Sequence, residues 1–172
     1  MYFCGKSDVG MRRQINQDSY RCISIWGGDA VLLVVCDGMG GANGGDIASK
    51  EAVSCITEVL SEQLNENIPQ ESIEKIFESS VKKANSSIYE MSQSKKELSG
   101  MGTTVVLALI YNDFLHIAHV GDSRAYIVNK DGIKQVTLDH SVVQELINNA
   151  AELAEYIQSN ILPDYDNFVK AG

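Results

Sequence analysis

The sequence lacks long hydrophobic runs. The longest fully apolar stretches, Ala30–Cys36 and Val105–Tyr111, have only seven residues each, whereas a membrane-spanning helix needs about 18 or more. The first ten residues, MYFCGKSDVG, also lack the charged-then-apolar layout of a secretory signal. We therefore expect no membrane association and a cytoplasmic location.

The sequence also has few positively charged residues and no closely spaced pair of cysteines. The chain carries 14 Lys and Arg against 23 Asp and Glu, a net charge of −9, so a nucleic-acid-binding face is not expected. Its four cysteines form no C-x-x-C pair, which disfavours zinc and thioredoxin-like chemistry. The abundant carboxylates favour hard divalent cations such as Mg²⁺ and Mn²⁺.

Apolar patterns predict strand pairs towards both ends of the chain and two helices between them. The helices are expected from about Asp46 and from near Pro69, where apolar residues recur at helical spacing. Segment 38–45, GMGGANGG, is predicted to be a loop because its five glycines destabilise regular elements. This order predicts an α+β fold with antiparallel sheets. A last helix is expected from Ser141, and the expected strands are 20–26, 30–36, 103–111, 114–120, 123–129 and 133–137.

Asp37 stands where an apolar strand meets the glycine-rich segment. A strand end fixes such a carboxylate, and the glycines let backbone approach a ligand, so the carbonyl of Gly38 can join the ligand set. An equally open interpretation is a turn aspartate, because Asp-Gly is a common turn pair.

Other acids occupy comparable places. Asp18 precedes a strand, Asp122 lies between two strands, and Asp139 precedes a helix and could be its N-cap. Arg13 is one of few cations near these acids, and its planar fork suits phosphate, although a surface ion pair would also explain it. His116 and His119 are three apart in a predicted strand and therefore point to opposite faces.

Five segments, taken in order, resemble the motifs of bacterial metal-dependent protein serine/threonine phosphatases of the protein phosphatase 2C family. They are DVGMRRQINQD (8–18), VCDGMGG (35–41), SGMGTT (99–104), HVGDSRAY (119–126) and TLDHS (137–141). The resemblance implies a two-sheet antiparallel β-sandwich flanked by helix pairs, a four-layer αββα fold. It also implies hydrolysis of phosphoserine and phosphothreonine in proteins by metal-activated water, with Mn²⁺ or Mg²⁺ as cofactor.

The resemblance also implies roles for individual residues. Asp37 would bridge two metal ions and Gly38 would add its carbonyl oxygen, while Arg13 would hold the substrate phosphate. Asp18 would lie near the metal-bound waters as a third catalytic residue, and Asp139 would be linked to a third metal ion.

Weaker matches complete the expected site. Gln17 stands where the family often has a Glu that contacts metal through water, and Asp122 is expected to support the ligands. Asp166, followed by Asn167, matches the family's last metal-binding motif. Met39 occupies the place where eukaryotic members often carry a histidine proposed as general acid.

The chain is shorter than the family's catalytic domain and lacks its later Ser-Asp-Gly motif, since the Asp-Gly pairs are only 37–38 and 131–132. We expect one domain over 1–172, well matched over 1–148 and shortened or divergent over 149–172. Its partners would be phosphorylated proteins, the targets of a serine/threonine kinase. The alternative is a weakened or inactive remnant that binds phosphoproteins or another partner. Uncovered strand edges also predict self-association.

Overall fold

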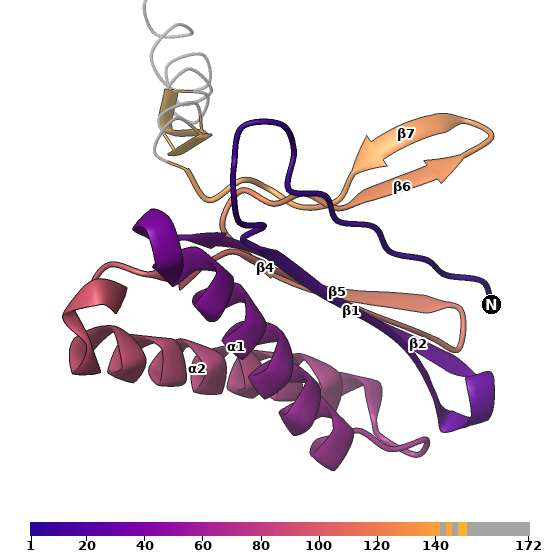
Figure 1. Cartoon of the computed structure of the whole chain (residues 1–172). Coiled ribbons are helices and arrows are strands. Elements are labelled where there is room, and N and C mark those ends of the chain that lie inside the picture. The colour runs from indigo at the N-terminus through magenta and orange to yellow at the C-terminus, as the bar shows by residue number, and fades with distance from the viewer. Residues whose placement is uncertain (142–143, 146–147, 151–172) are drawn as a thin grey trace, which may run out of the picture. The chain divides into compact units, whose positions relative to one another are not determined.

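A computed structural model describes residues 1–141, 144–145 and 148–150 of the chain. The chain divides into two compact units, Met1–Thr137 and Leu138–Gly172, and each is described by itself. The first unit holds the sheets and long helices shown in Figure 1. In the second, residues 144–145 and 148–150 are helical, which confirms these parts of the helix expected from Ser141.

An antiparallel sheet forms the centre of the first unit. Its main strands lie in the order β1-β2-β4-β5, and the short β3 pairs with β2. Asn112 and Asp113 join β4 to β5 with positive φ angles of 48° and 64°, as a two-residue hairpin requires. The strands are β1 (Asp18–Ile25), β2 (Ala30–Met39), β3 (Gly102–Thr103), β4 (Val105–Tyr111) and β5 (Phe114–Val120).

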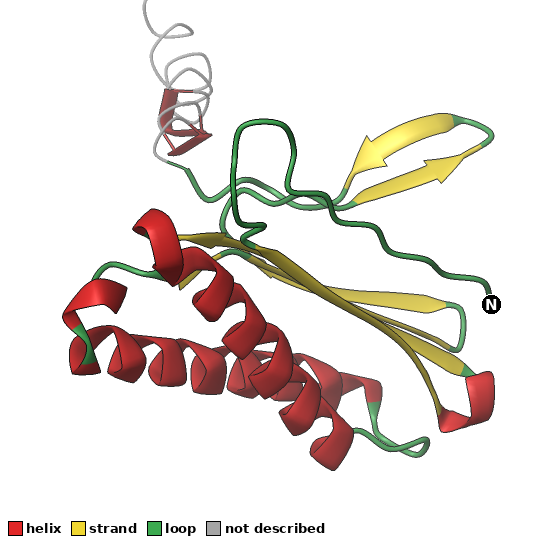
Figure 2. Cartoon of the chain, in the orientation of Figure 1, coloured by secondary structure: helices red, strands yellow, loops and turns green. Residues whose placement is uncertain are grey.

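Two long helices, α1 (Gly41–Gln63) and α2 (Gln70–Ser94), cover one face of this sheet (Figure 2). Pro69 stands at the N-cap of α2, where its missing N–H costs nothing. Fully buried side chains from both layers form the core, including Leu32, Ile56, Leu60, Ile73, Leu107 and Leu109. None of the helices in the described ranges is long and apolar enough to cross a membrane.

A separate hairpin, β6 (Tyr126–Asn129) and β7 (Gly132–Gln135), forms a two-stranded sheet. All of its residues are exposed, and Val128 and Ile133 each keep 71% of their surface in solvent. The α+β class with antiparallel sheets is confirmed. Within the described ranges, the sheet β1-β2-β4-β5 packs against the helix pair α1 and α2, as expected for one half of the sandwich. The hairpin β6–β7 forms a second, small sheet.

The glycine-rich segment differs from the prediction. Strand β2 continues through Asp37 to Met39, and α1 begins at Gly41, so the predicted loop over 38–45 is wrong. Tertiary packing overrides the weak intrinsic propensity of glycine because β2 and α1 touch backbone to backbone there. Two strand ends also differ from the prediction. The strand expected over 20–26 ends at Ile25, because Trp26 has a φ of 53°. The strand expected over 123–129 begins only at Tyr126.

Two further short elements complete the unit. The 3-10 helix η1 (Trp26–Gly28) links β1 to β2, and η2 (Lys96–Leu98) follows α2. In β5, His116 pairs with Leu109 and His119 with Val106. The two histidines therefore point to opposite faces, as predicted.

Candidate functional site

Asp18 and Asp37 face each other across the first two strands. Asp18 is the first residue of β1, and its Cα partner in β2 is Asp37. Directly opposed residues of an antiparallel pair put their side chains on the same face, with Cβ atoms about 4.5–5.5 Å apart. Two acids that stand 19 residues apart in the sequence thus form one carboxylate pair on the face opposite the helices.

The electrostatics of Asp37 reflect this crowding. Lost hydration raises the pKa of its carboxyl group most, and the charge of Asp18 and a side-chain hydrogen bond with Asp18 raise it further. The charge of Arg13 lowers the pKa of Asp37, and that of Asp122 raises it. The site therefore holds an excess of negative charge that a cation would relieve.

Thr104 holds the backbone of Asp37 on both sides. The Asp37 N–H donates to the Thr104 Oγ1 at 3.0 Å, and the Thr104 N–H donates to the Asp37 carbonyl oxygen at 2.9 Å. The Thr104 and Ser123 hydroxyl oxygens are 2.7 Å apart and hydrogen-bonded. Both residues belong to motifs noted in the sequence, but their support of Asp37 follows only from the packing of the strands.

Gly38 brings β2 against the start of α1. A Cβ on Gly38 would lie 1.9 Å from the carbonyl oxygen of Gly45 and 2.7 Å from that of Gln17. A Cβ on Gly45 would meet the Gly38 carbonyl oxygen at 2.8 Å. The Gly38 N–H donates to the Gln17 carbonyl at 3.0 Å. The residues that flank the carboxylate pair thus pack with no room for a side chain.

The N-terminal segment leads into the carboxylate pair through a side-chain turn. The Asn16 Oδ1 accepts a hydrogen bond from the Asp18 N–H at 3.0 Å, and the Asn16 Nδ2 donates to the Ser7 Oγ at 2.6 Å. Such an Asx turn fixes the chain just before the strand begins. Arg13 lies in this exposed segment, close enough to Asp37 to act on its pKa.

The remaining predicted residues are placed differently. Asp122 follows β5, is exposed and lies within electrostatic range of Asp37. Asp139 belongs to the second unit, and Asp166 lies outside the described residues. Within the described ranges, no group of three or more His, Cys, Asp or Glu side chains is arranged to hold a metal ion. The metal-binding roles of Asp139 and Asp166 and the supporting role of Asp122 therefore stay predictions.

The residues present nevertheless suit a hard divalent cation. Carboxylate oxygens are the ligands that Mg²⁺ and Mn²⁺ prefer. Asp18 and Asp37 supply two such groups on neighbouring strands, and the shared hydrogen bond between them shows that their oxygens converge. A cation between them would offset the negative charge that raises the pKa of Asp37.

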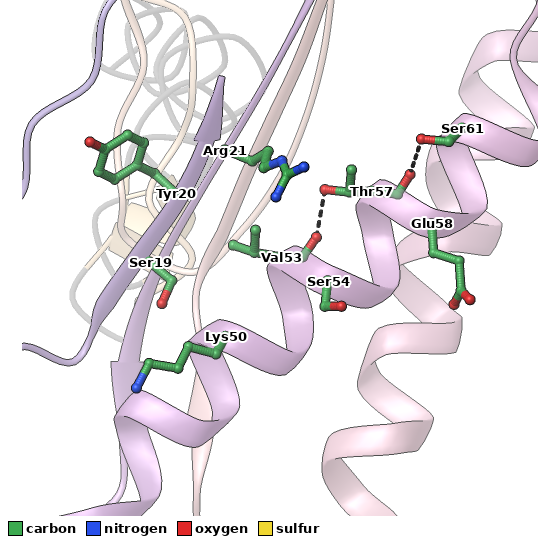
Figure 3. Close-up of a pocket in the computed structure, with 9 residues that line it drawn as sticks. All are labelled: Ser19, Tyr20, Arg21, Lys50, Val53, Ser54, Thr57, Glu58 and Ser61. Carbon is green, nitrogen blue, oxygen red and sulfur yellow. Dashed lines mark hydrogen bonds between the residues drawn. The ribbon is translucent and has the colours of Figure 1, made fainter. Parts of the chain in front are cut away.

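A separate pocket of about 430 Å³ lies between β1 and α1 (Figure 3). It includes Ser19 and Arg21, which alternate with Asp18 along β1 and therefore face the helices. Thr57 donates its hydroxyl to the Val53 carbonyl at 2.6 Å, so that hydroxyl proton is committed to the helix. This pocket is distinct from the carboxylate pair.

Comparison with known proteins agrees with the geometry. A family model described as protein phosphatase 2C matches residues 6–164. The chain belongs to this family. Among curated members it is 38% identical over 116 residues to the serine/threonine phosphatase stp of Listeria innocua, covering 67% of this chain and 46% of that protein. It is 30% identical over 158 residues to the serine/threonine protein phosphatase PstP of Mycobacterium tuberculosis, covering 92% of this chain and 29% of that protein.

Solved structures of bacterial phosphatases share the fold. Stp1 from Staphylococcus aureus superposes with a TM-score of 0.74 at 34% identity, covering 90% of this chain and 59% of that one. The PstP/Ppp phosphatase of Mycobacterium tuberculosis gives a TM-score of 0.70 at 30% identity, covering 84% and 57%. The chain therefore spans less than half the length of the stp relative and under two thirds of these structures.

Proposed function

We propose that this chain is a metal-dependent phosphatase of phosphoserine and phosphothreonine in proteins. The observation that carries the proposal is the Asp18–Asp37 carboxylate pair, with Arg13 within electrostatic range. Family membership supports the same reaction class. One relative, the catalytic domain of PstP, has been solved in complex with two manganese ions, which supports Mn²⁺ as the cofactor.

The carboxylate pair would hold the metal, with Asp37 as its central ligand. Asp18 adds a second carboxylate on the same face, and Gly38 would contribute its carbonyl oxygen. Divalent ions bound there would lower the pKa of a coordinated water and neutralise the phosphoryl oxygens. The Thr104 hydrogen bonds keep the Asp37 backbone in place, so its carboxylate needs little reorganisation on binding.

Arg13 would bind the substrate rather than the metal. Its guanidinium charge lowers the pKa of Asp37, and a planar guanidinium binds phosphate oxygens bidentately. A phosphate bound by Arg13 would thus lie beside the carboxylate pair. No protein nucleophile is required by this chemistry. We further propose phosphorylated targets of a serine/threonine kinase as substrates, acted on in the cytoplasm.

The test is hydrolysis of p-nitrophenyl phosphate and of a phosphothreonine peptide with Mn²⁺ and with EDTA. We expect Mn²⁺-dependent turnover that Asp37→Asn abolishes. Asp113→Asn is the matched control, because Asp113 is an exposed aspartate in the β4–β5 turn and Asn tolerates its positive φ. Activity that survives Asp37→Asn, or that persists in EDTA, would refute the metal-dependent mechanism.

The same samples test the alternative function, a remnant that binds phosphoproteins without hydrolysing them. Family membership and the manganese-bound PstP domain favour catalysis over this alternative. Binding of the phosphothreonine peptide with Mn²⁺, sensitive to Arg13→Ala but without turnover, would support it over catalysis.

A further inference from the structure

Among the described residues, strand β5 is an edge of its sheet. It is the last strand in the order β1-β2-β4-β5, and within the described ranges no strand pairs with its outer side. Natural edge strands usually carry charges or proline, which discourage pairing with another chain. The seven residues of β5, FLHIAHV, contain neither a formally charged side chain nor proline. The opposite edge, β1, includes Asp18 and Arg21.

The sequence of β5 is complementary to itself. In an antiparallel pair of two copies centred on Ile117, all seven residues find a partner. Phe114 then lies opposite Val120, an aromatic and β-branched combination that stabilises sheets. His116 lies opposite Ala118 and His119 opposite Leu115, so that no histidine faces a histidine. Neither copy brings a formal charge to the joined edge, although the chain has a net charge of −9.

Side-chain exposure marks the same strand. Phe114, Leu115 and Val120 keep 53%, 41% and 46% of their surface in solvent. Large apolar side chains gathered on an edge strand are typical of an interface. The nitrogen Nε2 of His116 is buried and has no hydrogen-bond partner in the described part of the chain.

A groove of about 750 Å³ runs between this edge and helix α2. His116 and Ala118 pair with the core residues Leu109 and Leu107, and therefore lie on the face that the helices cover. Opposed residues of an antiparallel pair share a face, so the helices of both copies would lie on one side of the joined sheet. The groove lining includes Phe77, Val81, Ile127 and Val136, with Glu74, Glu78 and Lys82 among its polar members.

We propose that β5 is a dimerisation edge that binds β5 of a second copy of this chain, antiparallel and centred on Ile117. The two five-stranded sheets then form one continuous sheet, and α2 of each copy covers the groove of the other. Glu78 and Lys82, which line the groove, form an ion pair with each other within one copy, so this pair adds no net charge to the interface. The proposal does not depend on catalysis or on metal.

Sedimentation velocity of the full chain tests the proposal. We expect a dimer whose fraction rises with protein concentration over about 1–100 μM, the range of a small interface, equally with Mn²⁺ and with EDTA. Leu115→Lys should shift the chain to monomer because it puts a charge on the edge. Ser24→Lys is the matched control, since it adds the same side chain to an exposed position of the other edge strand, β1, and should leave the dimer intact.

Cross-linking tests the register without disturbing the edge by charge. In a Cys4→Ser/Cys22→Ser background, Ile117→Cys should form a disulfide-linked dimer under mild oxidation, because opposed Cβ atoms approach disulfide range. Ser24→Cys in the same background should stay monomeric on denaturing gels.

Each outcome decides the proposal. A monomer at every concentration, or equal effects of Leu115→Lys and Ser24→Lys, would overturn it. A dimer that cross-links through position 24 and not through 117 would assign the interface to β1 instead. If Leu115→Lys unfolds, as judged by circular dichroism, the cross-link at position 117 still separates the two edges.

Discussion

Thr104→Val should weaken metal binding without touching a metal ligand. Valine has the shape of threonine but no hydroxyl, so the Asp37 N–H loses its acceptor at 3.0 Å and Ser123 loses its partner at 2.7 Å. The hydrogen bond from the Thr104 N–H to the Asp37 carbonyl remains. The substitution therefore releases Asp37 on one side only.

The expected size follows from these two hydrogen bonds. Each neutral hydrogen bond contributes about 0.5–1.5 kcal/mol. Thr104 is half-buried, so water replaces part of the loss and we expect about 1–2 kcal/mol in the free energy of unfolding. The Mn²⁺ affinity changes only by the part of this free energy that differs between the metal-free and the metal-bound protein. A fall of about 3- to 10-fold in Mn²⁺ affinity corresponds to about 0.7–1.4 kcal/mol.

Isothermal titration with Mn²⁺, together with thermal unfolding in EDTA, measures both quantities. Thr103→Val is the matched control, because the Thr103 hydroxyl donates to the Thr104 carbonyl at 3.0 Å and has no bond to Asp37. Thr104→Ser should restore affinity. Mn²⁺ affinity that is unchanged in Thr104→Val, or equally weakened in Thr103→Val, would refute the positioning role.

Three further predictions concern packing, pH and thiol chemistry. Gly38→Ala should cost more than about 3 kcal/mol in urea unfolding, because its Cβ would lie 1.9 Å from the Gly45 carbonyl oxygen; an unchanged midpoint would contradict the close packing. Folding raises the pKa of Asp37 above its ordinary 3.8, so the folded state binds more protons and stability falls as the pH rises through that raised pKa. Asp18→Asn removes the negative charge beside Asp37, so in EDTA its Tm should exceed that of the wild type by about 1–2 °C at pH 7 and by little at pH 3. A Tm gain of equal size at both pH values would argue against charge repulsion between Asp18 and Asp37. Burial raises the pKa of the Cys36 thiol to about 12, so a thiol reagent at pH 8 should modify exposed Cys4 quickly and Cys36 only after unfolding.

Much of the fold could be predicted from the sequence because its signals are local. The continuous apolar run Ala30–Cys36 predicts a buried strand. The Asn112-Asp113 pair predicts the hairpin turn between the next two strands. Pro69 and the 3.6-residue period after it identify α2. The loop predicted over the glycine-rich segment 38–45 is wrong, because intrinsic propensity does not include tertiary backbone contacts such as that of Gly38 with Gly45.

The candidate site shows the same division between local and tertiary information. Residue types and their places along the chain identify the residues that could carry the chemistry: Asp37 at a strand end, Asp18 before a strand, and Arg13 nearby. That Asp18 and Asp37 are direct partners follows only from the pairing of β1 with β2. Strand register could have been different, and a one-residue slip would put one of the two side chains on the other face. The contact of Thr104 with Asp37, 67 residues apart, likewise exists only once β2 and the strands after α2 lie side by side.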